Sequence, residues 1–581
     1  EEEKGEQEEK KEEEKRVRES VWKNAKLGLI IYSVLFLCCS TLSLLLPLFL
    51  SLIFVFIWYS YWVVGAPISI KIEGVGEEEE KEKVKDKKEG RTLAMTFKHS
   101  LSVCIGTWNS GDSPPNSSSF SDWMPNPGKY GVIAVGVQEC FFTKYDKSRF
   151  TSCEDAWWDM LTDFFGENFT LIAAHSVRNS IRLGVFVRNS LLPFVSEIRV
   201  GHIVNNIPVG YRKGAVCIGF KIYDTGLCFY NAHLTAHYNQ KYILARNHDV
   251  FRILNGVRLG HPLLETGKEY QHTFFFGDLN YRIEMKKDDL FPIVDKRDWS
   301  ALHPHDQLIK ERAKGNAFTA FHDCEPNFRP TYKLKKIPAD QISLRERNYN
   351  TNRIPAWCDR ILYSSFPGYS LRCCEFECCE QIVTSDHNPV RAAFEVELKH
   401  FVPKPIGKQV DMFIFVVELD EVVFKTLPPS SQEKERGENN KDNEREGEVE
   451  ADINRPFTLQ TPERSLSFLR VFSSETQNKV ITSPKIRGTE KNIWCFPPMK
   501  PLMTFPISLE CFKDQCFAVA VYNLSSNISS DFCVGQGLIS LSSYQLSPEI
   551  NLPFNEMMDL GGIHHGVLSG NLYIRAARTS I

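Results

Sequence analysis

The chain has 581 residues, enough for several domains, and its 42% hydrophobic and 24% charged residues are ordinary for globular protein. A formal net charge of −4 argues against a general nucleic-acid binder, although a local basic pocket could still hold a phosphorylated ligand. The 17 cysteines follow no regular spacing and favour reduced thiols on the cytosolic side over a disulfide framework.

The first 64 residues divide into a charged tail and an apolar run. Residues 1–26 are a low-complexity tail with too few apolar side chains to offset the entropy of ordering. No charged residue occurs from Leu27 to Val64, which predicts a membrane segment. The run is nearly twice the ~20 residues of one straight span, so a re-entrant hairpin and a single helix with an aromatic interfacial end both fit. Basic residues on both flanks favour the hairpin with both ends in the cytosol, and the identity of the membrane stays open.

A charged linker at 65–97 leads to an α/β pattern at 98–400, where short β-branched and aromatic runs alternate with amphipathic stretches. Most of the expected strands are almost continuously apolar, which is typical of sheets covered on both faces. The pattern therefore predicts a layered α/β sandwich. The expected strands are 101–109, 130–139, 182–189, 214–222, 227–234, 272–280 and 388–398, and the expected helices are 156–165 and 240–257. Paired cysteines in the run RCCEFECCE at 372–380 lack zinc-site spacing, so this run is expected to be a strand.

The last part of the chain, 408–581, reads as an all-β sandwich because its apolar residues alternate at period two. It contains an expected strand pair at 411–424 and an insertion at 430–454 that is too polar to fold alone. The succession of 521–532, 534–541 and 570–576 resembles a C2 domain, a lipid-docking module. Strong calcium binding is not expected, because the loop offers Asn523, Asn527 and Asp531 and so only one carboxylate.

Two motifs in the α/β region carry most of the chemical information. FFFGDLNYRIE, at 274–284, is an apolar run that stops at Gly-Asp and offers Asp278 and Asn280 on the same side of an extended backbone. PAWCDRIL, at 355–362, packs an indole, a thiol, a carboxylate and a guanidinium between apolar residues. Together they resemble the two signatures of the inositol polyphosphate 5-phosphatases. That resemblance implies a Mg-dependent enzyme on the DNase I-like fold, a four-layer α/β sandwich of the endonuclease/exonuclease/phosphatase superfamily.

Further polar residues at strand ends fit a phosphate-hydrolysing site, which needs charge neutralisation and an activated water. Within the resemblance, Glu139 is the principal magnesium ligand, and Asn109 and Asp386 build or support the metal site. Asp359 and Arg360 brace the site from behind it.

The resemblance also assigns catalytic roles. Asp278 would orient and deprotonate the attacking water together with His387. Asn280 would donate a hydrogen bond to an oxygen of the transition state. His233, in NAHLTAH, would contact the scissile phosphate.

Basic residues that bind the substrate's other phosphates would determine the substrate specificity. Tyr332 and Lys333, in PTYK, resemble the family residues that contact the 4-phosphate, and Arg353 and Lys213 are further candidates. The chain departs from the family at Thr351, where a lysine is common, so one cation of the substrate site is missing.

These expectations combine into a membrane-anchored enzyme whose catalytic domain faces the cytosol. Its expected substrates are phosphatidylinositol 4,5-bisphosphate or 3,4,5-trisphosphate, and soluble inositol polyphosphates are further candidates. Phosphoinositide lipids and the bilayer are the expected partners, nucleic acid is not, and no protein partner is assigned. A nuclease or sphingomyelinase of the same fold, and an inactive phosphoinositide-binding scaffold, are the alternatives.

Overall fold

The computed structural model describes residues 93–115, 119–177, 180–204, 213–337, 348–403, 411–427, 466–472, 480–488, 493–504, 506–524 and 531–579. The charged tail, the predicted membrane segment, most of the linker, the insertion at 430–454 and Asn527 lie outside these ranges. Among the helices within them, none is both long enough and apolar enough to cross a membrane.

One sheet of the α/β region has its strands in the order β11-β12-β1-β2-β4-β3. Among these six strands only β1 and β2 pair in parallel, and this pairing places Asn109 opposite Gln138 at their carboxyl ends. Strand β1, which ends at Asn109, and strand β2, which Glu139 directly follows, therefore end at the same edge of the sheet. The strands are β1 (Leu93–Asn109), β2 (Val132–Gln138), β3 (Phe169–Val177), β4 (Ile181–Arg188), β11 (Leu371–Cys378) and β12 (Val390–Pro403).

The second sheet has the order β5-β6-β7-β8-β10-β9. Strands β7 and β8 are parallel, so His233 lies opposite Asp278, and the antiparallel β10 places Asp359 on the other side of Asp278. Three expected site residues thus lie in one row across this sheet. The strands are β5 (Val195–Val204), β6 (Gly214–Ile222), β7 (Thr225–His233), β8 (His272–Asp278), β9 (His322–Asp323) and β10 (Asp359–Ser365).

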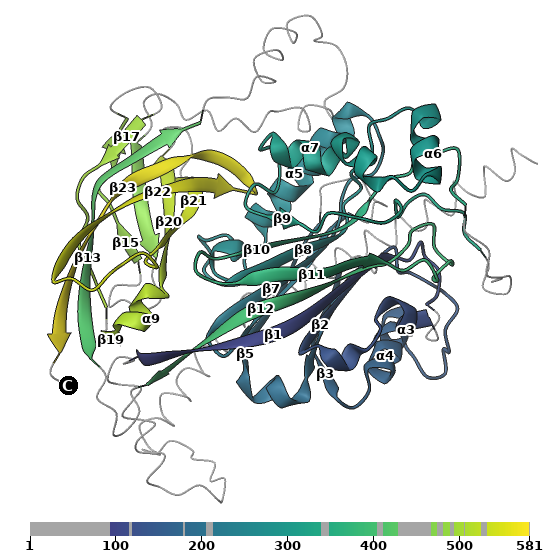
Figure 1. Cartoon of the computed structure of the whole chain (residues 1–581), viewed down its shortest axis with the longest axis horizontal. Coiled ribbons are helices and arrows are strands. Elements are labelled where there is room, and N and C mark those ends of the chain that lie inside the picture. Colours follow the sequence, from purple (N-terminus) through teal and green to yellow (C-terminus); the bar gives the residue numbers. More distant parts are fainter. Residues whose placement is uncertain are drawn as a thin grey trace, which may run out of the picture. The chain divides into compact units, whose positions relative to one another are not determined.

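The two sheets pack face to face, and helices cover their outer faces (Figure 1). Val103, Ile105 and Phe276 belong to the apolar core between the sheets. Trp157 of α4 packs outside the first sheet, and Val250 of α5 packs outside the second. The helices are α3 (Phe120–Trp123), α4 (Cys153–Phe165), α5 (Gln240–Gly256), α6 (Lys287–Asp295) and α7 (Gln307–Ala313), with 3-10 turns at Pro127–Lys129, Asn189–Phe194, Thr266–Lys268 and Trp299–His305. This four-layer arrangement confirms the expected DNase I-like α/β fold.

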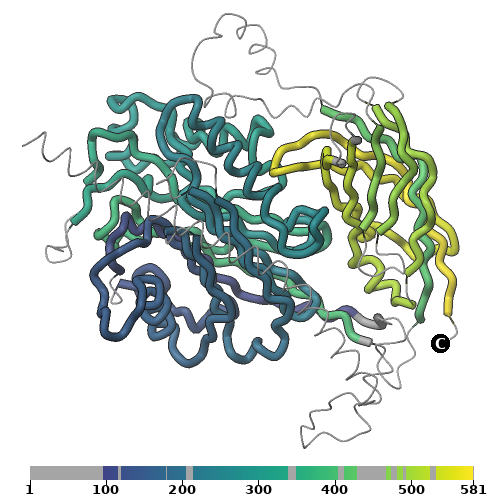
Figure 2. Tube along the Cα trace, turned by 180° about the vertical axis from the view of Figure 1, so that it is seen from behind, coloured from purple at the N-terminus to yellow at the C-terminus, as the bar shows by residue number. Residues whose placement is uncertain are grey.

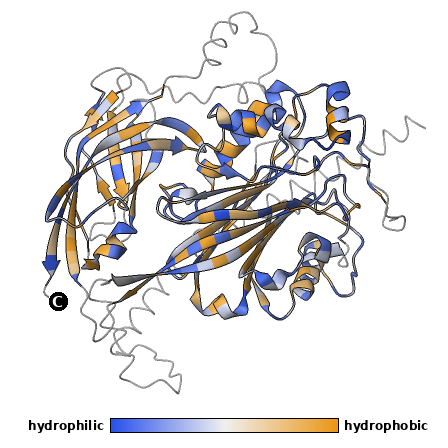
Figure 3. Ribbon diagram, viewed as in Figure 1, coloured by the Kyte–Doolittle hydropathy of each residue, from blue (hydrophilic) through white to orange (hydrophobic). Residues whose placement is uncertain are grey.

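Local sequence explains where these elements begin and end. Ser152 accepts a hydrogen bond from the backbone N–H of Asp155, whose carboxylate accepts from the N–H of Ser152, and this capping box starts α4. The helix ends at Gly166, whose φ of +69° suits a residue without a Cβ. Strands β2, β4, β7 and β8 are almost uniformly buried, and Figure 3 shows apolar residues running through the sandwich strands.

The C-terminal part is β-rich, as expected, and its central pairing joins β13 to β23 (Figure 2). The expected strand pair at 411–424 is wrong, because β13 is one strand throughout. Its irregularity is a register shift between Asp420 and Val423, where Glu421 has a φ of +50°. The elements are β13 (Met412–Thr426), β14 (Leu466–Phe472), β15 (Val480–Thr482), β16 (Ile486–Arg487), β17 (Ile493–Phe496), β18 (Leu502–Met503), β19 (Ile507–Ser508), α9 (Leu509–Lys513), β20 (Cys516–Leu524), β21 (Asp531–Ser540), β22 (Glu549–Leu560) and β23 (Ile563–Thr579).

A buried glutamate links the loop after α5 to the C-terminal strands. The backbone N–H of Glu265 donates to Gln536 Oε1 at 2.8 Å, and the N–H of Gly561 donates to Glu265 Oε1 at 2.6 Å. Next to it, Leu264 packs with Phe468 and Tyr522 in one apolar cluster. Burial raises the pKa of Glu265 to about 7, although the Gly561 N–H favours the carboxylate.

We expect Glu265→Gln to reduce the loss of stability on going from pH 5 to pH 8. The raised pKa means that the unfolded chain releases this proton first, so ionisation costs the fold up to about 3 kcal/mol between the unfolded value and pH ~7. Glutamine keeps the acceptor for Gly561 but does not ionise. Thermal unfolding of both proteins at the two pH values measures the effect, with the exposed Glu167→Gln as control; equal pH dependence in wild type and Glu265→Gln contradicts it.

A buried arginine ties PAWCDRIL to the rest of the second sheet. The guanidinium of Arg360 lies 3.1 Å from Asp306 Oδ1 and also contacts Asp323, and all three side chains are fully or almost fully buried. The guanidinium provides a cationic partner for two carboxylates in the interior, although Asp306 Oδ2 and Asp323 Oδ1 have no hydrogen-bond partner among the described residues.

We expect Arg360→Met to destabilise the protein by about 3–5 kcal/mol, because it leaves Asp306 and Asp323 buried without their cation. Urea unfolding monitored by circular dichroism measures the change. Arg372→Met is the control, because Arg372 pairs with Glu395 at the surface and its loss is expected to leave the unfolding midpoint unchanged. Similar unfolding midpoints for the two variants would show that the Asp306–Arg360–Asp323 group contributes little to stability.

Candidate active site

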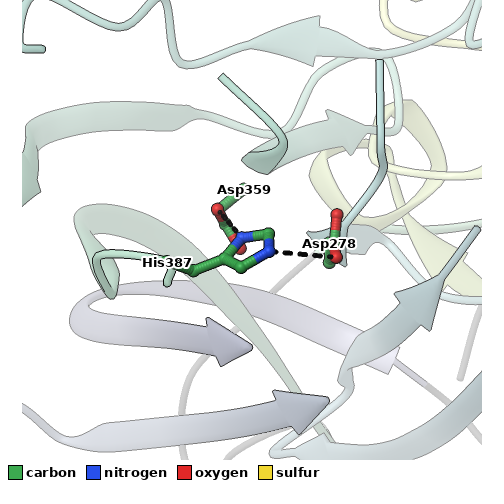
Figure 4. A group of neighbouring side chains, drawn as sticks. All are labelled: Asp278, Asp359 and His387. Carbon is green, nitrogen blue, oxygen red and sulfur yellow. Dashed lines mark hydrogen bonds and ion pairs between the residues drawn. The ribbon is translucent and has the colours of Figure 1, made fainter. Parts of the chain in front are cut away.

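The carboxylate of Asp278 lies at the centre of the site. Asn109 Nδ2 donates to Asp278 Oδ2 at 2.8 Å, and His233 Nε2 lies 3.2 Å from the same oxygen. His387 Nε2 approaches it from the other side at 3.9 Å (Figure 4). Asp278 is 1% exposed. Groups from both sheets and from the SDHNP loop thus converge on one buried carboxylate.

His387 is held by a second carboxylate. Its Nδ1 lies 2.9 Å from Asp359 Oδ2, which also accepts a hydrogen bond from the hydroxyl of Thr331 at 2.6 Å (Figure 4). The backbone N–H of Asn388 donates to the carbonyl of Thr331 at 2.9 Å, so the PTYK and SDHNP segments are joined directly. This arrangement fixes Nδ1–H toward Asp359 and turns Nε2 toward Asp278.

The charges of these groups depend on one another. Burial disfavours the imidazolium of His387, but Asp359 and Asp278 together raise its pKa to about 9. Burial likewise opposes the ionisation of Asp278, yet His387, His233 and Lys213 hold its pKa well below the usual range. At neutral pH the site therefore contains an ionised Asp278 facing a protonated His387.

His233 and Lys213 form the other wall of the site. Both are buried, and Lys213 Nζ is in hydrogen-bond contact with His233 Nε2. Burial, and then the charge of Lys213, lowers the pKa of His233, and burial lowers that of Lys213. Within the described residues, His233 Nδ1 is buried without a hydrogen-bond partner. The Nε2 edge of His233 therefore faces the site, and its Nδ1 edge is turned into the interior.

Glu139 lies at the mouth of the site. It follows β2 directly with a φ of +46°, its side chain is 40% exposed, and its Oε1 lies 3.8 Å from His233 Nε2. Glu139 and Asn109 offer the oxygen donors that a hard divalent cation prefers, so this donor chemistry fits magnesium. Asn109 Oδ1 already accepts from the N–H of Gly111 at 3.0 Å, which orients the amide.

A second group of ligand atoms lies deeper. Atoms of Asp278, Asp359 and His387 lie within 4.8 Å of one another and could also hold a metal ion. However, His387 Nδ1 and Asp359 Oδ2 already bond to each other, and an imidazole nitrogen is a poor ligand for magnesium. We therefore interpret this trio as a proton-handling group and the Glu139 end as the better place for a hard cation.

Asp386 contacts lysines. Its Oδ2 lies 2.9 Å from Lys333 Nζ, and its Oδ1 lies 3.7 Å from Lys336 Nζ. Lys336 also donates to the carbonyl of Gly111, in the loop after β1. The structure thus connects an expected support of the metal site with an expected substrate-binding lysine.

Asn280 and Tyr332 are positioned by Arg282. Asn280 has a φ of +57°, and its N–H donates to Asp278 Oδ1 at 3.1 Å. Its Nδ2 donates to the carbonyl of Leu234 at 3.1 Å, and Arg282 donates to its Oδ1. The guanidinium of Arg282 lies 4.6 Å from the Tyr332 ring, which is 4.5 Å from the His387 ring. The amide of Asn280 therefore has one remaining N–H for a ligand.

The remaining expected residues lie at the edge and behind the site. Arg353 is exposed in the turn before PAWCDRIL, and its charge acts on Lys333. Arg360 points away from Asp359 and bonds Asp306 and Asp323, so it braces the second sheet.

Sequence reasoning missed the connecting hydroxyls Thr331 and Ser385. Ser385 Oγ donates to the carbonyl of Asn109 at 2.6 Å and accepts from the N–H of His387 at 3.1 Å. Both residues stand directly before named motif residues, Thr331 before Tyr332 and Ser385 before Asp386. Their position next to motif residues is the feature of the sequence that could have indicated them.

Comparisons with known proteins give matches that include this region. Residues 106–393 match the family model described as "Endonuclease/Exonuclease/phosphatase family 2". The human "Phosphatidylinositol 3,4,5-trisphosphate 5-phosphatase 1" is 27% identical over 506 residues, which cover 81% of this chain and 37% of that protein. The mouse "Phosphatidylinositol 3,4,5-trisphosphate 5-phosphatase 2" is 31% identical over 350 residues, 56% of this chain and 27% of that protein. The chain thus matches well under half the length of these relatives.

Among solved structures, the inositol polyphosphate 5-phosphatase domain of SPsynaptojanin, in complex with inositol (1,4)-bisphosphate and calcium, is 25% identical with a TM-score of 0.45. The match covers 56% of this chain and 90% of that domain. The family match spans every strand-end residue of the site from Asn109 to His387. The domain that carries this site belongs to the Endonuclease/Exonuclease/phosphatase family 2.

Proposed function

We propose that this chain is a magnesium-dependent phosphatase that removes the 5-phosphate from phosphoinositides. The observation that carries the proposal is the ionised, buried Asp278 between His387 and His233, next to hydrogen-bond donors from Asn109 and Asn280. Such a site can orient a water against a phosphate and stabilise the charge that develops on the phosphoryl oxygens. The names of the relatives support the same reaction.

The side chains of the site have different roles in this reaction. Asp278 orients the attacking water, and its low pKa makes it a weak base, so it takes the proton only as the new bond forms. The protonated His387, held by Asp359, and the cation Lys213 lie beside it and supply positive charge for the phosphoryl oxygens. The free N–H of Asn280 is available as a further contact.

Magnesium would be held at the end of the site that contains Glu139 and Asn109. When bound, it would neutralise phosphoryl charge and lower the pKa of the attacking water, which a base as weak as Asp278 requires.

Basic residues at the edge support a substrate with further phosphates. Lys333 and Lys336 converge on Asp386, and Arg353 adds an exposed cation nearby. Together with Tyr332, they form a positive rim that suits a 4-phosphate next to the scissile 5-phosphate. We propose phosphatidylinositol 4,5-bisphosphate and 3,4,5-trisphosphate as substrates, with soluble inositol polyphosphates as additional ones.

We further propose that the uncharged run Leu27–Val64 anchors the enzyme to a membrane with the catalytic domain in the cytosol. Anchoring would raise the local concentration of lipid headgroups at the site. A C2-like role for residues 408–581 in lipid docking belongs to the same proposal.

We expect the wild-type protein to release phosphate from these lipids only with magnesium, and Asp278→Asn to lower kcat by at least about 100-fold. The amide cannot accept the proton and carries no charge. Release from defined lipids and soluble inositol phosphates, with and without a chelator, measures both effects. Asp122→Asn, an exposed carboxylate on α3, is the matched control.

Circular dichroism of each variant separates a lost site from a lost fold. A folded wild-type protein that binds the lipids but releases nothing would favour the scaffold alternative and end the enzymatic proposal.

We expect Lys333→Ala to lower kcat/KM for phosphatidylinositol 4,5-bisphosphate by about 10- to 100-fold, through the loss of a charge-assisted contact. The effect should be smaller for phosphatidylinositol 5-phosphate, which lacks the 4-phosphate. Lys335→Ala, an exposed lysine two positions on, is the control. Equal losses on both lipids would instead indicate that Lys333 acts through Asp386.

A further inference from the structure

Two cysteines meet where the edges of the two sheets come together. Among the described strands, β9 pairs only with β10 at the edge of the second sheet, and β11 pairs only with β12 at the edge of the first. Cys324 directly follows β9, and Cys373 lies in β11. Their sulfur atoms lie 3.1 Å apart although the residues are 49 positions apart in sequence. No disulfide joins them, and both thiols are free.

The surroundings give the two thiols different chemistry. Cys324 is 4% exposed, whereas Cys373 is partly exposed. The S–H of Cys324 donates to Cys373 Sγ, and this hydrogen bond lowers the pKa of Cys373 against the opposing effect of burial. Burial raises the pKa of Cys324. Cys373 is therefore the nucleophile of the pair, because the thiolate is the reactive form.

We propose that Cys324 and Cys373 are an oxidation site at which hydrogen peroxide forms a disulfide between the two sheet edges. The Cys373 thiolate attacks peroxide, the O–O bond breaks, and a sulfenic acid and hydroxide result, the latter protonated to water. The sulfur of Cys324 then attacks that of Cys373, loses its proton and expels a second water. Two thiols lose two electrons in all, and one peroxide is reduced to two waters.

The disulfide would close a loop that contains much of the candidate site. Tyr332, Lys333, Arg353 and Asp359 all lie between the two cysteines in sequence. A covalent link restricts the unfolded chain more than the folded one, and more so for a long loop. The link would also fix the position of Cys324, whose neighbour Asp323 contacts Arg360. Oxidation should therefore hold this segment in its folded position without changing any side chain that faces a substrate.

The chain contains a matched pair that should stay reduced. Cys217 and Cys228, on the neighbouring strands β6 and β7, have their sulfur atoms 3.4 Å apart, but both are 0% exposed. They are not direct partners, since Cys217 lies opposite Tyr230. Cys217 and Cys228 are therefore a control pair in the same domain, with neighbouring sulfur atoms that are closed off from solvent. Cys374 tests the opposite case, because it is exposed and lies at the register shift that directly follows Cys373 in β11.

The test treats the reduced full chain with a small excess of hydrogen peroxide, blocks the remaining thiols and maps disulfides by mass spectrometry without reduction. The expected result is a Cys324–Cys373 link that dithiothreitol reverses, no Cys217–Cys228 link, and a rise in Tm of about 3 °C or more. Cys324→Ser and Cys373→Ser should each abolish both the link and the Tm rise, whereas Cys374→Ser should keep them.

Other outcomes would overturn the proposal. These are Cys374 oxidised while Cys324 and Cys373 stay reduced, a Cys373–Cys374 link, or a Tm rise that persists in Cys373→Ser. Because Cys373 is partly exposed, its serine variant is expected to fold even if the Cys324 variant does not. None of these readouts uses phosphate release, so the outcome is independent of the proposed reaction.

Discussion

The site depends on keeping one carboxylate charged inside the protein. An isolated Asp278 at 1% exposure would take up a proton, because desolvation penalises the anion. The amide of Asn109, the imidazoles of His387 and His233 and the ammonium of Lys213 reverse that preference. Each of these groups comes from a different segment, so the buried carboxylate stays charged only because both sheets and the SDHNP loop are in place. Folding and the preparation of the site are therefore one event.

The two sheets contribute through strand direction. The parallel pairs β1–β2 and β7–β8 place strand ends side by side, and the antiparallel β10 begins where β8 ends. Residues that directly follow or end a strand are thereby delivered to one edge without long loops. The apolar core between the sheets and the Asp306–Arg360–Asp323 group hold those edges in register.

Much of this was predictable from sequence because the signals were local. Uninterrupted apolar runs predicted the strands, and polar residues at their ends, such as Asp278 and Asn109, predicted where a site would form. Contacts that depend on side-chain geometry across loops were not predictable. Examples are the ion pairs of Arg360 with Asp306 and Asp323 and the hydrogen bond from Thr331 to Asp359. The contact of Asp386 with two lysines is another. The strand pair expected at 411–424 failed because Asp420 and Glu421 resemble a turn in sequence, whereas the long partner β23 keeps β13 continuous.

The backbone at Glu139 has a further consequence. Left-handed φ values are tolerated well by glycine and fairly well by asparagine, as at Asn280, but a glutamate at +46° costs free energy of order 1 kcal/mol or more. Selection for thermal resistance alone would place glycine there and remove the exposed carboxylate. Under the proposed magnesium role of Glu139, glycine at this position would relieve the backbone strain but remove a ligand of the cation, so stability of the fold and cation binding make opposite demands on this one residue.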